Sequence, residues 1–121
     1  MTNYTREDFE EALQLVTSTI SNCEKMQQKF AEGTSSHTLL KNRIKALYIS
    51  KALITEEDII NHYTKEELLQ ALPPVNSIIS KCEKGQLKFA EGTSHHTRFK
   101  KIIKAMYLSK ALITEEISRI D

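Results

Sequence analysis

An internal repeat constrains the fold of this chain more than any other feature of its sequence. Residues 4–57 align with residues 63–116 at a constant offset of 59 without a gap, and 35 of these 54 positions are identical. The identity is higher from Cys23 onward (26 of 35 positions) than before it (9 of 19 positions). Repetition at a fixed period is typical of a duplicated supersecondary unit. We therefore expect one domain over residues 1–121, made of two copies joined by a linker at about residues 58–62.

Each copy opens with the signals of a long helix. Thr5 is followed three residues later by Asp8, and Thr64 by Glu67, which is the pattern of a capping box. Apolar residues, with one glutamine in each copy, then recur at steps of three and four, as they do on one face of a helix. This seam consists of Phe9, Leu13, Val16, Ile20, Cys23, Gln27 and Phe30, and in the second copy of Leu68, Leu72, Val75, Ile79, Cys82, Gln86 and Phe89.

A tight corner and a second helix follow in each copy. Gly33 and Gly92 are suited to end the first helix because glycine tolerates a positive φ, and the Thr-Ser pair after each glycine offers an N-cap for the next helix. The apolar rhythm then resumes, which makes each copy a helical hairpin. Its positions are His37, Leu40, Ile44, Leu47, Lys51 and Ile54, and then His96, Phe99, Ile103, Met106, Lys110 and Ile113.

Two further signals modify this hairpin. The residues Thr55-Glu-Glu-Asp58 predict a short helix to about Asn61, and Thr114-Glu-Glu predicts its counterpart near the end of the sequence. Pro73 and Pro74 fall inside the long first helix of the second copy. Because proline lacks an N–H and clashes with the preceding turn, we expect a kink or a break there.

The predicted fold is an all-α four-helix bundle, since one hairpin cannot bury its own seam and must pack against the other. The sequence leaves the mutual orientation of the hairpins open. If the helices alternate up and down, both corners lie at one end of the bundle. If the hairpins are reversed, the corners lie at opposite ends and cannot share a ligand.

The repeated corner is the first candidate site. A helix N-terminus offers free N–H groups and the positive end of the helix dipole, and hydroxyls, an imidazole and a lysine beside it would suit phosphate. The structural alternative is that glycine ends one helix, serine caps the next and His37 covers the end of the bundle. The candidate anion-binding residues are Gly33, Thr34, Ser35, His37, Lys41, Gly92, Thr93, Ser94, His96 and Lys100.

A second apolar stripe on the second helix of each copy is the other candidate. At about 100° per residue it lies more than about 90° from the seam, so one bundle interior does not easily cover both. Either the short third helix folds back over the stripe, through Ile59 and Ile60 or through Ile117 and Ile120, or a second copy or a partner helix covers it. The stripe consists of Ala46, Ile49, Leu53, Ala105, Leu108 and Leu112.

Polar residues on the seam allow two interpretations. Lys51 and Lys110 either hold a ligand carboxylate or phosphate, or extend their ammonium groups past the core into water. Gln27 and Gln86 are expected to set the packing register through hydrogen bonds. Cys23 and Cys82 lie on the seam, so we expect buried, reduced thiols.

Composition narrows the classes of function. The net charge is +1, but nine of the 17 basic residues lie in residues 36–54 and 95–113, which contain no acid. No apolar stretch approaches the roughly 18 residues of a membrane span and no secretion signal opens the sequence, so we expect a cytoplasmic protein without membrane contact. The spacing of Cys23 and His37 fits no zinc pattern, and nothing supplies an oxyanion site. We expect no enzymatic activity, catalytic residue, metal or cofactor.

The interpretation that needs the fewest assumptions is an interaction or regulatory protein that binds a protein partner, or itself as a homodimer, through its bundle. The alternative is a nucleic-acid or phosphoanion binder that uses the two corners with Lys41, Lys45, Lys100 and Lys104. A sequence pI near 7.8 argues against this alternative.

Overall fold

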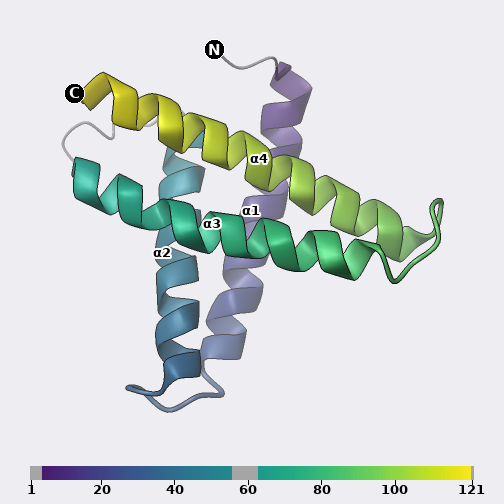
Figure 1. The fold of residues 1–121 in the computed structure, drawn as a ribbon, viewed down its shortest axis with the longest axis horizontal. Coiled ribbons are helices and arrows are strands. Elements are labelled where there is room, and N and C mark those ends of the chain that lie inside the picture. Colours follow the sequence, from purple (N-terminus) through teal and green to yellow (C-terminus); the bar gives the residue numbers. More distant parts are fainter. Residues whose placement is uncertain (1–3, 56–62, 121) are drawn as a thin grey trace.

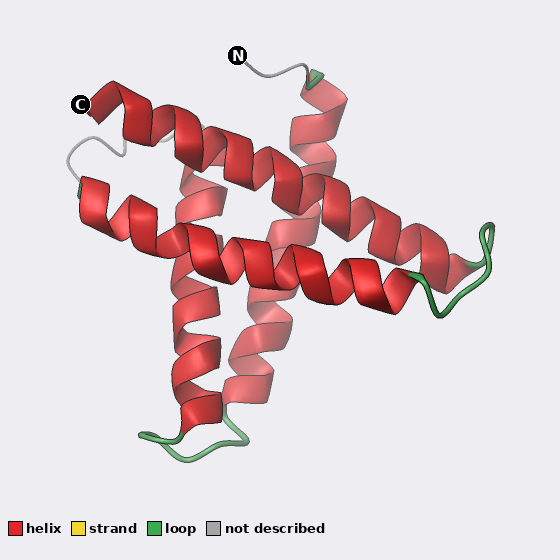
Figure 2. Cartoon of the chain, in the orientation of Figure 1, coloured by secondary structure: helices red, strands yellow, loops and turns green. Residues whose placement is uncertain are grey.

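The computed structural model describes residues 4–55 and 63–120, which form four α-helices and no strand (Figures 1 and 2). The helices are α1 (Arg6–Gln27), α2 (Ser35–Ile54), α3 (Lys65–Gln86) and α4 (Ser94–Ile120). Their buried apolar residues form one core to which all four helices contribute. The predictions of an all-α fold and of four main helices packed together are confirmed.

The helix ends are those that the local sequence predicts. Thr5 and Thr64 head complete capping boxes, in which the threonine hydroxyl accepts from a main-chain N–H and the carboxylate three residues later accepts from the threonine N–H. Gly33 and Gly92 have φ values of +92° and +91°, a region that glycine enters without steric cost. Within the Thr-Ser pair that we predicted to supply the N-cap, the threonine takes this role, because the hydroxyls of Thr34 and Thr93 accept from the helix.

The two hairpins lie across one another (Figure 1). Helices α1 and α2 run side by side, α3 and α4 do the same, and the second pair crosses the first. Helices α2 and α4 each contact all three other helices, whereas α1 and α3 do not contact each other. Neither predicted orientation is found: the corner between α1 and α2 and the corner between α3 and α4 project from different sides of the molecule. The two corners cannot share a ligand.

The second apolar stripe is buried where the hairpins cross. Ala46 and Ile49 are each 1% exposed, Ala105 is 3% exposed and Leu108 is fully buried. Leu53 and Leu112 are partly buried and pack against the same core. The stripe is therefore not a free interface within the described structure. The other hairpin of the same chain covers it, which was not among the alternatives drawn from the sequence.

The predicted short helix after the second hairpin is not a separate element. Helix α4 continues through Thr114 to Ile120, and the Thr114 hydroxyl donates to the carbonyl of Lys110 (2.8 Å) instead of capping a new helix. Ile117 packs against the core, whereas Ile120 is exposed. The corresponding short helix of the first copy, with Ile59 and Ile60, falls outside the described residues.

Two ion pairs tie the hairpins together at equivalent places. Lys45 Nζ lies 2.9 Å from Glu67 Oε2, and Lys104 Nζ lies 2.8 Å from Asp8 Oδ1. Under the repeat offset of 59, Lys104 corresponds to Lys45 and Glu67 to Asp8. Each carboxylate is also the second member of a capping box. The same group therefore starts a helix and connects that helix to the other hairpin.

The pKa values of these carboxyls are lowered for different main reasons. The hydrogen bond from Lys104 is the largest cause of the low pKa of Asp8, followed by the main-chain N–H of Thr5. For Glu67 the main-chain N–H of Thr64 comes first and Lys45 second. The pKa of Lys104 is raised, chiefly by its hydrogen bond to Asp8.

Burial of the stripe predicts a strong effect on stability. Leu108→Ala or Ile49→Ala should each lower the free energy of unfolding by about 2–5 kcal/mol, because the change leaves a cavity between the hairpins. Leu87 is 86% exposed, so Leu87→Ala should change the free energy of unfolding by less than about 0.5 kcal/mol. Urea unfolding followed by circular dichroism measures all three variants. Equal, small effects would show that the stripe does not lie in the core.

The ion pairs predict an unequal response to acid. A carboxyl group whose pKa is lower in the folded than in the unfolded state stabilises the fold at pH values above its unfolded pKa, which is about 4. This contribution is lost as the pH falls through the folded pKa. Lys104→Met removes the largest cause of the low pKa of Asp8. Lys45→Met removes only the second-largest cause of the low pKa of Glu67. Side-chain carboxyl NMR titration should therefore show a larger rise in pKa at Asp8 in the first variant than at Glu67 in the second. A larger rise at Glu67 would contradict this assignment.

Candidate functional site

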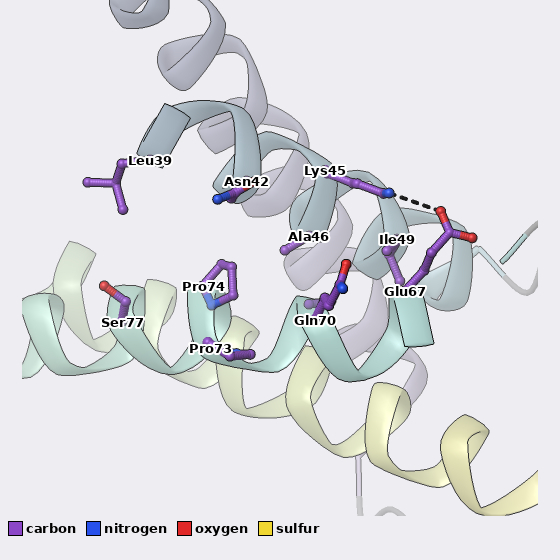
Figure 3. A pocket seen from close by; sticks show the side chains of 11 residues that line it. Leu39, Asn42, Lys45, Ala46, Ile49, Glu67, Gln70, Pro73, Pro74 and Ser77 are labelled. Carbon is purple, nitrogen blue, oxygen red and sulfur yellow. Dashed lines mark ion pairs between the residues drawn. The ribbon is translucent and has the colours of Figure 1, made fainter. Parts of the chain in front are cut away.

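A groove of about 480 Å³ lies between α2 and α3 (Figure 3). Ala46 and Ile49 from α2 and Ala71 from α3 lie beneath the groove and are at most 3% exposed, so its accessible apolar side chains include Leu39, Pro73 and Pro74. Leu39 forms part of the rim and is 50% exposed. Sites that bind small organic groups commonly enclose roughly 300–1,000 Å³. The groove therefore has the size of a binding site.

Charged side chains in and beside the groove are already engaged within the protein. The pair of Lys45 and Glu67 lies at one part of the groove (Figure 3). Ser77 also lines the groove, and its hydroxyl accepts from Arg43 Nη2 (3.1 Å). Arg43 Nε is buried without a partner in the described structure. The lining contains one cation and one anion, which pair with each other, and the Arg43 guanidinium lies beside it as a second cation.

Pro73 and Pro74 face this groove and do not break α3, so the predicted break is wrong. In an α-helix the carbonyl of residue 70 accepts from the N–H of residue 74, and in a 3₁₀ turn from that of residue 73. Both residues are proline and have no N–H. The Gln70 carbonyl therefore lacks both helical donors.

The groove coincides with a region in which the two copies differ. Seven of its eleven lining residues differ from their counterparts at the offset of 59, compared with 19 differences (54 − 35) over the whole repeat. At the equivalent place between α1 and α4, Arg98 and Lys101 replace Leu39 and Asn42, and Gln14 and Leu15 replace the prolines. The substitutions put short or rigid side chains on the groove side and longer ones on the equivalent side.

The corners sit at the ends of the hairpins and are largely exposed. Gly33, Thr34, Ser35 and Lys41 are exposed, and His37 is half-buried. Their counterparts have the same exposure, with Gly92, Thr93, Ser94 and Lys100 exposed and His96 half-buried. The main-chain N–H of each histidine donates to the capping threonine (3.2 Å). The structure brings each set together within its own corner but keeps the two sets apart.

The second corner also holds a small aromatic cluster that the first corner lacks. The Phe89 ring stacks on His95, with ring centres 4.7 Å apart, and on Phe99, at 6.0 Å. A Cβ added to Gly85 would meet the Phe99 ring at 2.9 Å. The corresponding residues of the first copy are Ser36, Leu40 and Met26. The large Phe99 fits because Gly85 stands where the first copy has Met26. Packing therefore explains why the two copies differ at these positions.

The seam lysines occupy dissimilar places. Lys51 lies in the last turn of α2, where a cation meets the negative end of the helix dipole. Lys110 lies within α4, which continues to Ile120, so Lys110 is not at a helix end. Both side chains are half-buried. Gln27 Nε2 donates to the carbonyl of His37 at 3.5 Å, a contact within the first hairpin.

The cysteines are free thiols, as predicted. Cys82 is buried and Cys23 is half-buried, and burial raises the pKa of both thiols. Because α1 and α3 do not contact each other, the Cα atoms of the two cysteines are more than 8 Å apart. A disulfide would require the backbone to move. Neither thiol is activated as a nucleophile.

Sequence analysis did not identify the groove. Leu39, Asn42 and Gln70 carry no motif, and they come together only because the hairpins cross. One signal was present, since Pro73 and Pro74 interrupt a helical pattern at a place where the copies differ.

Comparisons with known proteins complete the description of the site. In the residues that the structure describes, no group of three or more His, Cys, Asp or Glu side chains could hold a metal ion, and no helix is long and apolar enough to cross a membrane. A scan against protein-family models finds no match for the chain, and searches of curated proteins and of solved structures find none either.

Proposed function

We propose that this chain is a non-enzymatic interaction protein that binds a segment of a partner protein in the groove between α2 and α3. The observation that supports the proposal most directly is a groove of about 480 Å³ that is lined mainly by apolar side chains near its rim, with Leu39 50% exposed. Two helices that flank an apolar groove offer the geometry in which partner helices and extended segments commonly dock.

Because the second apolar stripe is buried, we propose the groove as the interface instead of the stripe. A homodimer or partner helix seated on Ile49 and Leu108 would have to displace the other hairpin of the same chain, because both residues lie in its core. Leu39 is accessible without any such change. The exposed rim of the groove is therefore open to a partner of the folded chain, whereas the stripe residues Ala46 and Ile49 beneath it belong to the core.

We further propose that the repeat arose by duplication of one helical hairpin. The matched burial of Val16 with Val75, Ile49 with Leu108 and Ser50 with Ser109 supports a common origin. Duplication would have produced two equivalent surfaces, one between α2 and α3 and one between α1 and α4. Divergence at the first surface would then have opened the groove between α2 and α3.

The alternative of an anion or nucleic-acid binder has less support. Lys45 and Lys104 are engaged with Glu67 and Asp8, which leaves Lys41 and Lys100 of the four lysines that the alternative invoked. These two belong to corners on different sides of the molecule. A continuous basic surface across both corners is not available to a nucleic-acid backbone.

Selection from a random peptide library displayed on phage tests the proposed function. Peptides enriched on the wild-type protein should bind the variant Leu39→Arg with Asn42→Lys at least about tenfold more weakly, because truncating or blocking an interface anchor commonly costs more than about 1 kcal/mol. Both substitutions introduce the residue that the second copy carries at the equivalent helical position. Both positions are exposed, so the variant should fold normally.

The matched control is Leu87→Arg, which makes the same chemical change at a leucine that is 86% exposed and outside the groove. Enriched peptides should bind this variant as they bind the wild type. Peptides that bind all three proteins alike, or a selection that enriches no peptide, would reject the groove as the interface.

A further inference from the structure

We infer that the corner between α3 and α4, residues 87–93, docks on a lipid bilayer that carries anionic head groups, with Leu87 inserted among them. This corner is separate from the groove, so docking there goes beyond the proposed function. We expected no membrane contact because the sequence has no spanning segment, but docking on a bilayer surface needs none.

Leu87 is the most accessible large apolar side chain of the described residues. It is 86% exposed, and the next most exposed is Leu39 at 50%. Leu87 directly follows α3, and Phe89 in the same corner is 37% exposed. The first copy has Gln28 at the place of Leu87. Packing explains Phe99 and Gly85 but not Leu87, which remains in water. A single exposed leucine is common on protein surfaces, so the charges around it decide what it fits.

Those charges are strongly positive. Residues 81–101 contain six basic residues and two acids, a net charge of +4, whereas the equivalent residues 22–42 of the first copy have a net charge of +1. The whole chain carries +1, so the residues outside 81–101 carry −3. All six basic side chains are exposed, and none forms an ion pair with another described residue. They are Lys81, Lys84, Lys88, Arg98, Lys100 and Lys101.

The six cations lie close enough to the corner to act with Leu87. The most distant ones are six or seven residues into a helix, which is about 10 Å at 1.5 Å per residue. Electrostatic attraction reaches about 8–10 Å at ordinary salt. An anionic surface that meets the corner would therefore attract these side chains together, and the negative remainder of the chain would turn away from it.

The shape of the corner favours a bilayer over a polymer. The corner projects from the crossed helices at the end of the second hairpin (Figure 1). A projecting leucine can enter a soft layer of head groups, whereas a folded partner would need a hollow to receive it. A nucleic-acid backbone would meet the lysines but would leave Leu87 in water. Basic residues and an apolar anchor act together at a bilayer, where one weak signal alone does not hold a protein.

The test uses the full chain and vesicles of phosphatidylcholine with or without about 30% phosphatidylserine. Co-sedimentation should show binding that requires phosphatidylserine and weakens as salt is added. Leu87→Gln introduces the residue of the first copy and should weaken binding about tenfold, because one leucine no longer inserts. Lys81→Asn with Lys101→Asn also introduces first-copy residues and should weaken binding at least about tenfold.

Matched controls lie outside this corner. Leu39→Gln makes the same change at another exposed leucine, and Lys25→Asn with Lys41→Asn removes two exposed cations from the first corner. Both should bind the vesicles within about twofold of the wild type. Insertion has its own readout, because the chain contains no tryptophan. Emission from Leu87→Trp should shift to shorter wavelength with the phosphatidylserine vesicles, whereas emission from Gln28→Trp should not.

Three results would overturn the inference: no binding to the phosphatidylserine vesicles, equal weakening by the corner variants and their controls, or unchanged emission from Leu87→Trp on bound vesicles. Poly-glutamate or a single-stranded oligonucleotide that binds more tightly than the vesicles and depends on Leu87 would assign the corner to an anionic polymer instead. None of these results bears on the groove, which the peptide selection tests separately.

Discussion

Burial of two separate faces of the second helix in each repeat is the constraint on which the rest of the structure depends. One face packs against the first helix of the same hairpin, and the other carries Ile49 in α2 and Leu108 in α4. A hairpin covers the first face by itself but leaves the second exposed to water. Crossing the hairpins covers both second faces at once, which places α2 and α4 in contact with every other helix. These helices and their corners belong to the part of the repeat with 26 of 35 identical positions, so the copies are most alike where packing requirements are strictest.

The same crossing sets the surface features of the molecule. It brings the first turn of α3 against α2 and the first turn of α1 against α4, where Glu67 meets Lys45 and Asp8 meets Lys104. Next to the first of these pairs, α2 and α3 leave a groove with the prolines on its wall. A nearly symmetric core thus supports a surface that is not symmetric. Only one of the two equivalent surfaces carries Leu39, Pro73 and Pro74.

Local structure was largely predictable from the sequence, because short-range chemistry decides it. Thr5 with Asp8 and Thr64 with Glu67 begin helices through hydrogen bonds between neighbours, and Gly33 and Gly92 end them through a backbone conformation that few other residues tolerate. The predicted Thr-Ser pair supplies the N-cap through its threonine, Thr34. Periodicity also identified both apolar faces of the second helix.

The arrangement of the hairpins was not predictable, because periodicity assigns residues to a face without naming what covers that face. The groove depends on this arrangement and could not be located without it. The uninterrupted α3 has a different cause. Its buried residues Ala71 and Val75 hold the helix in place on either side of the prolines, while Pro73 is exposed and Pro74 half-buried. Tertiary packing thereby outweighs the local preference of proline.

The most direct test of the central claim is an isotope-filtered NOESY measurement on a mixture of methyl-labelled and unlabelled protein. Ala46 of α2 and Ala71 of α3 line the same floor where the hairpins cross. If one chain covers its own second stripe, cross-peaks between these methyl groups appear within a single molecule and are unchanged on dilution. Cross-peaks that appear only between labelled and unlabelled molecules would contradict the account, because a second copy would then cover the stripe.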